Sequence, residues 1–193
     1  MKNRGILSFL IICMFAVIGC GRPVSVVSLE ELPDTYNLEQ AKKDGCVVHE
    51  DGDVTAGKKA FETFYQNVRS GKKDTIRLAF YYTLGDPSGY DPDYYESIQD
   101  DYPALYIEDL SFDGEEYTLH WYEEGEEIVR KYSYLLKYEG EAESSTALYK
   151  SYVRYVLTND DEVTWQDIMQ GVLSSQYGDY IDFSSVCTDL IYK

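Results

Sequence analysis

The sequence predicts an α+β domain, in which an antiparallel β-sheet (a meander of about five or six strands) packs with N-terminal and C-terminal helices. Three observations lead to this fold class. The central part of the chain alternates apolar and polar residues with a period of two, and both ends carry apolar residues at helical spacing. The 20 tyrosines suit half-buried sheet faces, where a ring packs and a hydroxyl stays in water.

Helical spacing marks two segments near the start of the expected domain. Asn37 is a suitable N-cap for a short helix that reaches Lys43 and stops at Gly45. A second helix is expected from about Lys58 to Ser70. Its apolar stripe consists of Phe61, Phe64, Tyr65 and Val68.

A third helix is expected near the C-terminus. Thr164 and Asp167 have the spacing of a capping box, which marks a helix start. The expected core stripe of this helix is Trp165, Ile168, Met169, Val172 and Leu173.

Segments with strand character fill the remainder of the domain. They cover residues 75–83, 105–112, 117–122, 128–138, 149–158 and 181–191. Asp113-Gly114 and Glu124-Gly125 join three of them, and Asp-Gly is a strong signal for a tight hairpin. Because side chains alternate along a strand, Trp121 is expected to face away from His120 and Tyr122.

The N-terminus has the features of an export signal. Lys2 and Arg4 precede an apolar run from Ile6 to Ile18, whose 13 residues are too few to span a bilayer. A spanning helix needs about 20 apolar residues, whereas a secretory h-region needs roughly 7 to 15. The run is therefore interpreted as a signal peptide.

This run leads into Val17-Ile18-Gly19-Cys20, which resembles the lipobox of bacterial lipoproteins. In that family the cysteine receives a diacylglycerol and becomes the first residue of the mature chain. The resemblance therefore implies lipidation of Cys20 and attachment to the outer side of a bacterial cell membrane. The expected organisation is a signal peptide at 1–19, the lipidated cysteine with a tether at 20–36, and one domain at 37–193. The alternatives are an ordinary signal peptide and an uncleaved anchor.

The expected mature chain is strongly acidic. Residues 1–19 hold Lys2 and Arg4 and no Asp or Glu, so their removal changes the formal net charge from −18 to −20. Nucleic acid is not an expected partner, because phosphate binding needs clustered Lys and Arg. An acidic surface also repels anionic headgroups, so membrane attachment should depend on the lipid. Solubility is the simplest interpretation of the acidity, with cation binding as the alternative.

Two cysteines, Cys46 and Cys187, remain in the expected domain. Export permits a disulfide between them, which would close a loop of about 140 residues and stabilise the fold by ~5 kcal/mol on the chain-entropy model. Two buried thiols that act as small apolar groups are the alternative. The sequence leaves both open.

A second resemblance covers roughly a third of the mature domain. LEQAKKDGCVVHEDGDV at 38–54 and FETFYQNVRSGKKDTIRLAFYYTLGDP at 61–87 resemble the core of a Gram-positive cell-surface lipoprotein family that is known only as a domain of unknown function. The chain departs from that family at Leu84 and Cys46, where acidic or amide residues are usual, and residues 88–104 look like an insertion. The resemblance implies location and fold class and transfers no catalytic residue.

The acidic segment HEDGD at 49–53 invites a metal site, because its aspartates, Thr55 and Glu62 match calcium-loop spacing. Such a loop requires Gly at its sixth position, where this chain has Ala56, and Lys58 would place a positive charge inside the cage. No metal site is expected. The segment is interpreted as an acidic turn that leads into a capped helix.

Four residues are candidates for contact with a ligand or partner. Asp86 lies in a Gly-Asp-Pro turn that either presents its carboxylate or only ends a strand. His120, Trp121 and Tyr122 could form an aromatic platform for sugar rings. The other interpretation is that Trp121 belongs to the core and His120 faces solvent.

The expected function is non-catalytic: an interaction or ligand-binding module at the cell envelope, whose partner is an envelope protein or a wall component. No cofactor and no catalytic residue are expected, since neither G-x-S-x-G nor H-E-x-x-H occurs. One alternative is an envelope hydrolase acting on wall glycan or peptide, with carboxylates between Tyr94 and Asp101 or near His120 as acid and base. Another is an accessory subunit of a membrane complex.

Overall fold

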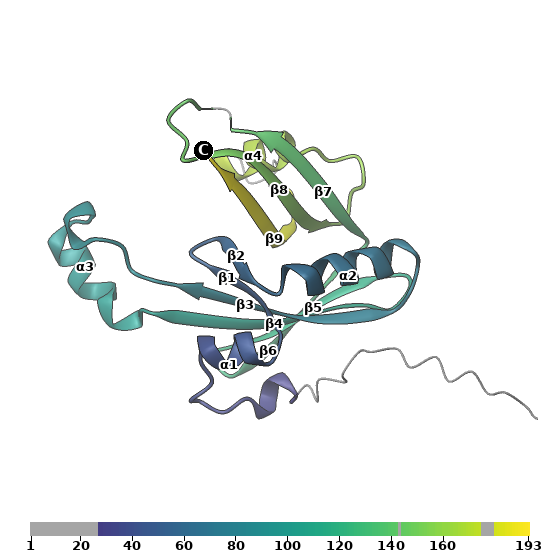
Figure 1. Ribbon diagram of the computed structural model, residues 1–193, viewed down its shortest axis with the longest axis horizontal. Coiled ribbons are helices and arrows are strands. Elements are labelled where there is room, and N and C mark those ends of the chain that lie inside the picture. Colours follow the sequence, from purple (N-terminus) through teal and green to yellow (C-terminus); the bar gives the residue numbers. More distant parts are fainter. Residues whose placement is uncertain (1–26, 143, 175–179) are drawn as a thin grey trace, which may run out of the picture.

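The computed structural model describes residues 27–142, 144–174 and 180–193 (Figure 1). The expected signal peptide, the lipobox and Cys20 lie outside the described residues. Within the described part of the chain, no helix has the length and apolar character needed to cross a membrane.

Two β-sheets form the framework. One has six strands in the order β2-β1-β3-β4-β5-β6, and the other has three in the order β7-β8-β9. Neighbouring strands are antiparallel except β1 and β3, which are parallel. The strands are β1 (Val47–Glu50), β2 (Asp53–Ala56), β3 (Asp74–Tyr82), β4 (Ala104–Phe112), β5 (Tyr117–Glu123), β6 (Glu126–Tyr132), β7 (Tyr134–Glu141), β8 (Tyr149–Thr158) and β9 (Phe183–Tyr192).

The helices lie on more than one face of this framework. They are α1 (Leu38–Lys43), α2 (Lys58–Arg69), α3 (Pro92–Ile98) and α4 (Trp165–Leu173), with short 3-10 turns η1 (Leu29–Glu31), η2 (Pro87–Gly89) and η3 (Gln99–Asp101). In Figure 1, α1 lies below the six-stranded sheet and α2 above it, and we call these the lower and upper faces. The expected arrangement of one meander with helices at its two ends was therefore too simple.

The second sheet covers the upper face next to α2. Leu157 and Cys187 of this sheet belong to the same buried cluster as Phe64 of α2 and Leu78 of β3. The other side of the second sheet is covered by α4, where Ile168 packs in a separate cluster. From bottom to top the layers are α1, the six-stranded sheet, α2 with the second sheet, and α4 (Figure 1).

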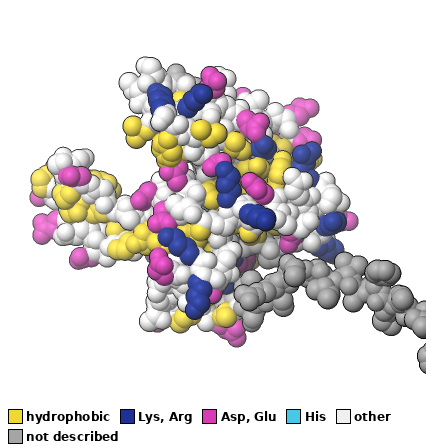
Figure 2. Space-filling view, in the orientation of Figure 1, with side chains coloured by type: hydrophobic (Ala, Val, Ile, Leu, Met, Phe, Trp, Pro, Cys, Tyr) yellow, Lys and Arg dark blue, Asp and Glu magenta, His cyan; other side chains and the backbone are white. Residues whose placement is uncertain are grey.

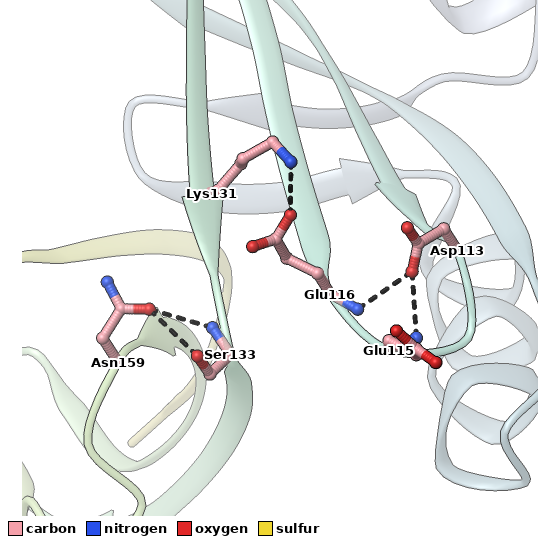
Figure 3. A network of polar contacts seen from close by, with 6 residues as sticks. All are labelled: Asp113, Glu115, Glu116, Lys131, Ser133 and Asn159. Carbon is pink, nitrogen blue, oxygen red and sulfur yellow. Dashed lines mark hydrogen bonds and ion pairs between the residues drawn. The ribbon is translucent and has the colours of Figure 1, made fainter.

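The strand expected at 128–138 is in fact two strands that belong to different sheets. Between them, the amide and the hydroxyl of Ser133 both donate to the side-chain oxygen of Asn159, at 3.0 and 3.3 Å (Figure 3). The Ser133 amide is thus held by a side chain at the point where the chain changes sheet. The expected Asp-Gly hairpin is present, and Asp113 accepts hydrogen bonds from the amides of Glu115 and Glu116.

The acidic turn expected within residues 49–53 is present at Asp51-Gly52, but it joins two strands and does not lead directly into a capped helix. These residues form the β1–β2 hairpin, and His49 is buried in it with 3% of its surface exposed. α2 follows Gly57, which has φ 74° and no capping side chain. Glycine is required because a Cβ there would lie 2.4 Å from the carbonyl oxygen of Cys46.

The segment between β3 and β4, residues 83–103, projects beyond both sheets (Figure 1). It contains η2, α3 and η3, and we call it the α3 arm. It includes most of the expected insertion.

Two further expectations were wrong. The expected tether at 20–36 includes η1, whose Leu29 is buried and which packs against β4 and β5. The expected core stripe of α4 includes Val172 and Leu173, which are 48% and 80% exposed. The capping box of that helix is present, with the amide of Asp167 donating to the Thr164 hydroxyl at 3.2 Å.

Candidate functional site

A cavity of about 820 Å³ lies beside the first half of β3. It exists because β4 pairs with β3 from Asp74 onwards, whereas β1 pairs with it only from Leu78. Among the described residues, no strand fills the β1 side of β3 before Leu78. The N-terminal segment, α2 and β3 bound this gap. The residues that line the cavity include Tyr36, Gln40, Asp44, Cys46, Thr63 and Arg77.

The N-terminal wall of the cavity is fixed by local hydrogen bonds. Asn37 caps α1 by accepting from the amide of Gln40 at 3.1 Å. The helix ends at Lys43, and Gly45 follows with a φ of 82° that lets the chain reverse. The amide of Cys46 then donates to the carbonyl of Ala41 at 3.0 Å, which leads the chain from α1 into β1.

Polar side chains on this wall form a short network. The Tyr36 hydroxyl donates to Asp44 at 3.2 Å, and the Gln40 amide donates to the other oxygen of that carboxylate at 2.7 Å. The same Tyr36 hydroxyl lies 3.7 Å from the sulfur of Cys46. The network therefore fixes the Tyr36 ring and the Cys46 thiol against the cavity.

The opposite wall carries a buried ion pair. Arg77 of β3 donates from Nε and Nη2 to the two carboxylate oxygens of Asp109 of β4, at 2.7 and 2.8 Å. The two residues are directly paired across the strands, and their side chains are only 9% and 21% exposed. This two-pronged geometry occupies two of the guanidinium nitrogens and leaves Nη1 as a further donor.

Burial controls the protonation of two side chains that line the cavity. Burial raises the pKa of the Cys46 thiol, and the hydrogen bond to Tyr36 and the charge of Arg77 only partly offset this. Burial, and next the contact with Cys46, also raises the pKa of Tyr36. Both groups therefore stay protonated at neutral pH, and a protonated thiol is a weak nucleophile.

The structure separates the three expected aromatic-platform residues as the strand alternation predicted. His120 and Tyr122 share the lower face, with ring centroids 5.5 Å apart, and the His120 Nε2 lies 3.1 Å from a Glu127 oxygen. Trp121 faces the other way, packs against the core and has the Arg130 guanidinium 5.4 Å from its ring centroid. The three side chains do not form one platform.

Asp86 lies in the α3 arm, beyond the end of β3 that is opposite to the cavity. Its carboxylate accepts from the amide of Ser88 at 2.8 Å and caps η2. The hydrogen bonds to Ser88 lower the pKa of this exposed carboxylate. The geometry matches the simpler of the two interpretations, a turn that ends a strand.

The disulfide alternative is not realised. Cys46 and Cys187 are both free and buried. They belong to different hydrophobic clusters, Cys46 with Ala41 below the six-stranded sheet and Cys187 with Phe61 above it. The described residues also contain no group of three or more His, Cys, Asp or Glu side chains placed to hold a metal ion.

Two buried or half-buried titratable groups on the upper face were missed from the sequence. His49 stacks on Phe80, with ring centroids 4.7 Å apart, and burial lowers its pKa to about 4. Glu108 of β4 is half-buried, and burial raises its pKa to about 7 while the charge of Arg130 acts in the opposite direction. Neither position could be recognised as buried without knowing the strand register.

No family model, curated protein or solved structure matches this chain.

Proposed function

We propose that this protein is a lipid-anchored extracytoplasmic module of the bacterial cell envelope that binds a small molecule without transforming it. The cavity beside β3 is the observation that carries the proposal, because its volume of about 820 Å³ lies in the range of small-molecule sites. Its walls combine apolar side chains such as Leu32 and Phe64 with the polar groups of Gln40 and Arg77. A ligand with an apolar body and a polar end fits such walls.

The polar groups favour binding over catalysis. Asp109 occupies two nitrogens of Arg77, and the raised pKa of Cys46 keeps its thiol protonated. Neither group is poised as an acid, a base or a nucleophile. The carboxylates expected for a hydrolase between residues 94 and 101 lie on the α3 arm, away from the cavity lining.

The expected anchor would keep the cavity near the membrane. Val27, the first described residue, lines the cavity, and seven residues beyond Cys20 reach at most about 25 Å when fully extended. A ligand delivered from the membrane surface is therefore within reach of this site. The resemblance to Gram-positive surface lipoproteins at residues 38–54 and 61–87 supports the same location.

The binding proposal is tested by native mass spectrometry of the full-length chain purified from membranes in mild detergent. Thr63→Trp, which places a bulky ring at the cavity wall, is compared with Gln66→Trp, on the exposed side of the same helix. We expect a bound small molecule on the wild type and on Gln66→Trp and none on Thr63→Trp. An empty wild-type protein, or a molecule retained by Thr63→Trp, would contradict the proposal.

The anchor is tested on the same preparations by intact mass. We expect the wild-type chain to begin at Cys20 and to carry the mass of a diacylglycerol, and the Cys20→Ala chain to lack that mass and to leave the membrane fraction. A wild-type chain without lipid would refute the anchor and leave the cavity result unaffected.

A further inference from the structure

The far end of the upper face carries exposed tyrosines that the second sheet does not cover. Tyr82 at the end of β3 is 40% exposed, and Tyr106 near the start of β4 is 56% exposed. Their ring planes meet at 62° with centroids 6.1 Å apart, so the two rings form a corner. Tyr102, which is 36% exposed, lies close enough to Tyr82 to raise its pKa.

A carboxyl group lies beside this corner. Glu108 is two residues from Tyr106 on the same strand and pairs with Leu78 of the buried core, so it shares the upper face with both tyrosines. Burial and then the charge of Glu108 raise the pKa of Tyr82. The charged group that acts on Glu108 is Arg130 of β6, which lowers the pKa of this carboxyl and partly offsets burial.

The sequence around this corner is poor in cations, and Arg130 of β6 is the cation that acts on Glu108. Residues 78–129 contain no Lys and no Arg, whereas the α3 arm alone carries six carboxylates: Asp86, Asp91, Asp93, Glu96, Asp100 and Asp101. In Figure 2 the α3 arm shows yellow and magenta side chains and no dark blue ones. The arm therefore projects a negative, tyrosine-rich surface into solvent.

From this geometry we infer that the corner of Tyr82 and Tyr106, with Glu108 at its side, docks a Lys- or Arg-rich segment of a partner protein. Two tyrosine faces attract an ammonium or guanidinium group through their ring quadrupoles, and Glu108, whose pKa is about 7, adds negative charge in its ionised form. The charge complementarity decides the occupant, since an anionic partner would meet only carboxylates here.

This inference does not depend on the cavity beside β3, which lies at the opposite end of that strand. The arm carboxylates extend the contact, because they can attract further cationic residues of the same segment and accelerate the encounter. The contact is the kind expected of an accessory subunit that meets a basic partner at the envelope.

The experiment uses the full-length chain in detergent and a fluorescent octalysine peptide as the probe, with binding followed by anisotropy at low and high salt. Tyr106→Leu and Tyr82→Leu are compared with Tyr122→Leu, a tyrosine of similar exposure on the lower face, and with Tyr106→Phe, which keeps the ring. We expect Tyr106→Leu and Tyr82→Leu each to weaken binding about two- to fivefold, and the two other variants to bind like the wild type.

Equal weakening by Tyr122→Leu, or no effect of Tyr106→Leu, would overturn the inference and leave only non-specific attraction to an acidic surface. Should a leucine variant fail to fold, wild-type protein with isotope-labelled tyrosine gives the same answer. The ring signals of Tyr82 and Tyr106 should then shift on titration with octalysine while that of Tyr122 stays in place. Unmoved signals of Tyr82 and Tyr106 would overturn the inference as well.

Discussion

The two faces of the six-stranded sheet hold their titratable side chains in different ways. On the lower face, Arg77 and Asp109 meet in a buried two-pronged ion pair at the edge of the cavity. On the upper face, His49 is buried against Phe80 and Glu108 is half-buried, and neither forms an ion pair among the described residues. On the lower face the two opposite charges of this pair compensate each other. On the upper face burial shifts the pKa of His49 and of Glu108 so that the neutral form of each is favoured.

This difference predicts different responses to mutation and to pH. A paired charge stays ionised, so its removal leaves a buried charge without compensation at any pH near neutral. An unpaired buried group favours its neutral form instead, so its effect on stability changes with pH in the range between its unfolded and folded pKa values. The three predictions below test this contrast.

Arg77→Met is expected to have the largest effect. It leaves the Asp109 carboxylate buried without its partner and should lower the free energy of unfolding by about 3 kcal/mol. The double variant with Asp109→Leu should recover much of this loss, because it removes the uncompensated charge. Urea unfolding at neutral pH measures both. Lys131→Ala is the control: the pair of Lys131 with Glu116 is exposed (63% and 40%) and should contribute less than about 1 kcal/mol (Figure 3).

If Arg77→Met and Lys131→Ala lower the free energy of unfolding by similar amounts, burial does not determine how much the two ion pairs contribute to stability.

Acidification should act through His49. Its pKa is about 4 in the folded chain against 6.5 ordinarily, so the unfolded chain takes up the proton first as the pH falls. The contribution of His49 to the free energy of unfolding is present above pH 6.5 and is lost as the pH falls from 6.5 to about 4. The difference between the two pKa values corresponds to about 3 kcal/mol. Among the described residues neither imidazole nitrogen has a well-aligned hydrogen bond, although the Ala79 carbonyl is near enough to offset part of the pKa change.

The variant His49→Leu should lose this contribution, so its stability relative to the wild type should rise as the pH falls from 6.5 to about 4, which urea midpoints over a pH series would show. Only the slope is compared, because leucine also changes the packing against Phe80. His120→Gln, which alters the histidine on the lower face, is measured alongside it as the comparison variant. An unchanged slope in His49→Leu would mean that acid lability arises elsewhere.

Much of the local structure could be predicted because its signals are short-range. The stripe of Phe61, Phe64 and Val68 gave α2, the Thr164–Asp167 spacing gave the start of α4, and Asp113-Gly114 gave the β4–β5 hairpin. Alternation along β5 also put Trp121 on the correct face. Each of these inferences needs only residues that are neighbours in the sequence.

The missed features depend on long-range pairing. β1 has only four residues, and the last two, His49 and Glu50, already belong to the acidic HEDGD segment. Its burial beneath the second sheet therefore leaves no periodic signal in the sequence. The pairing of Arg77 with Asp109 spans the α3 arm, and an intervening segment of that length hides the register between β3 and β4. The cavity could not be predicted for the same reason, because it follows from where β1 starts to pair with β3.

Glu108→Gln is expected to have the smallest effect. The contribution of Glu108 to the free energy of unfolding falls as the pH rises, whereas that of His49 falls as the pH is lowered. The carboxyl has a pKa of about 7 in the folded chain against 4.5 ordinarily, so its contribution is present below pH 4.5 and is lost as the pH rises to about 7. Glutamine cannot ionise. The variant should therefore match the wild type near pH 4 and exceed its free energy of unfolding by about 2 kcal/mol at pH 8, after allowance for partial exposure.

Glu123→Gln, at an exposed position at the end of β5, is the matched control and should change nothing over the same range. Between pH 4.5 and 6.5 the contributions of Glu108 and His49 oppose each other, so the wild-type protein should show a flatter pH dependence than either single variant. Urea unfolding of the wild type and both variants over this range measures that directly. If the Glu108→Gln curve runs parallel to the wild type, the carboxyl is ionised in the fold, and the upper face would neutralise charge by the same means as the lower.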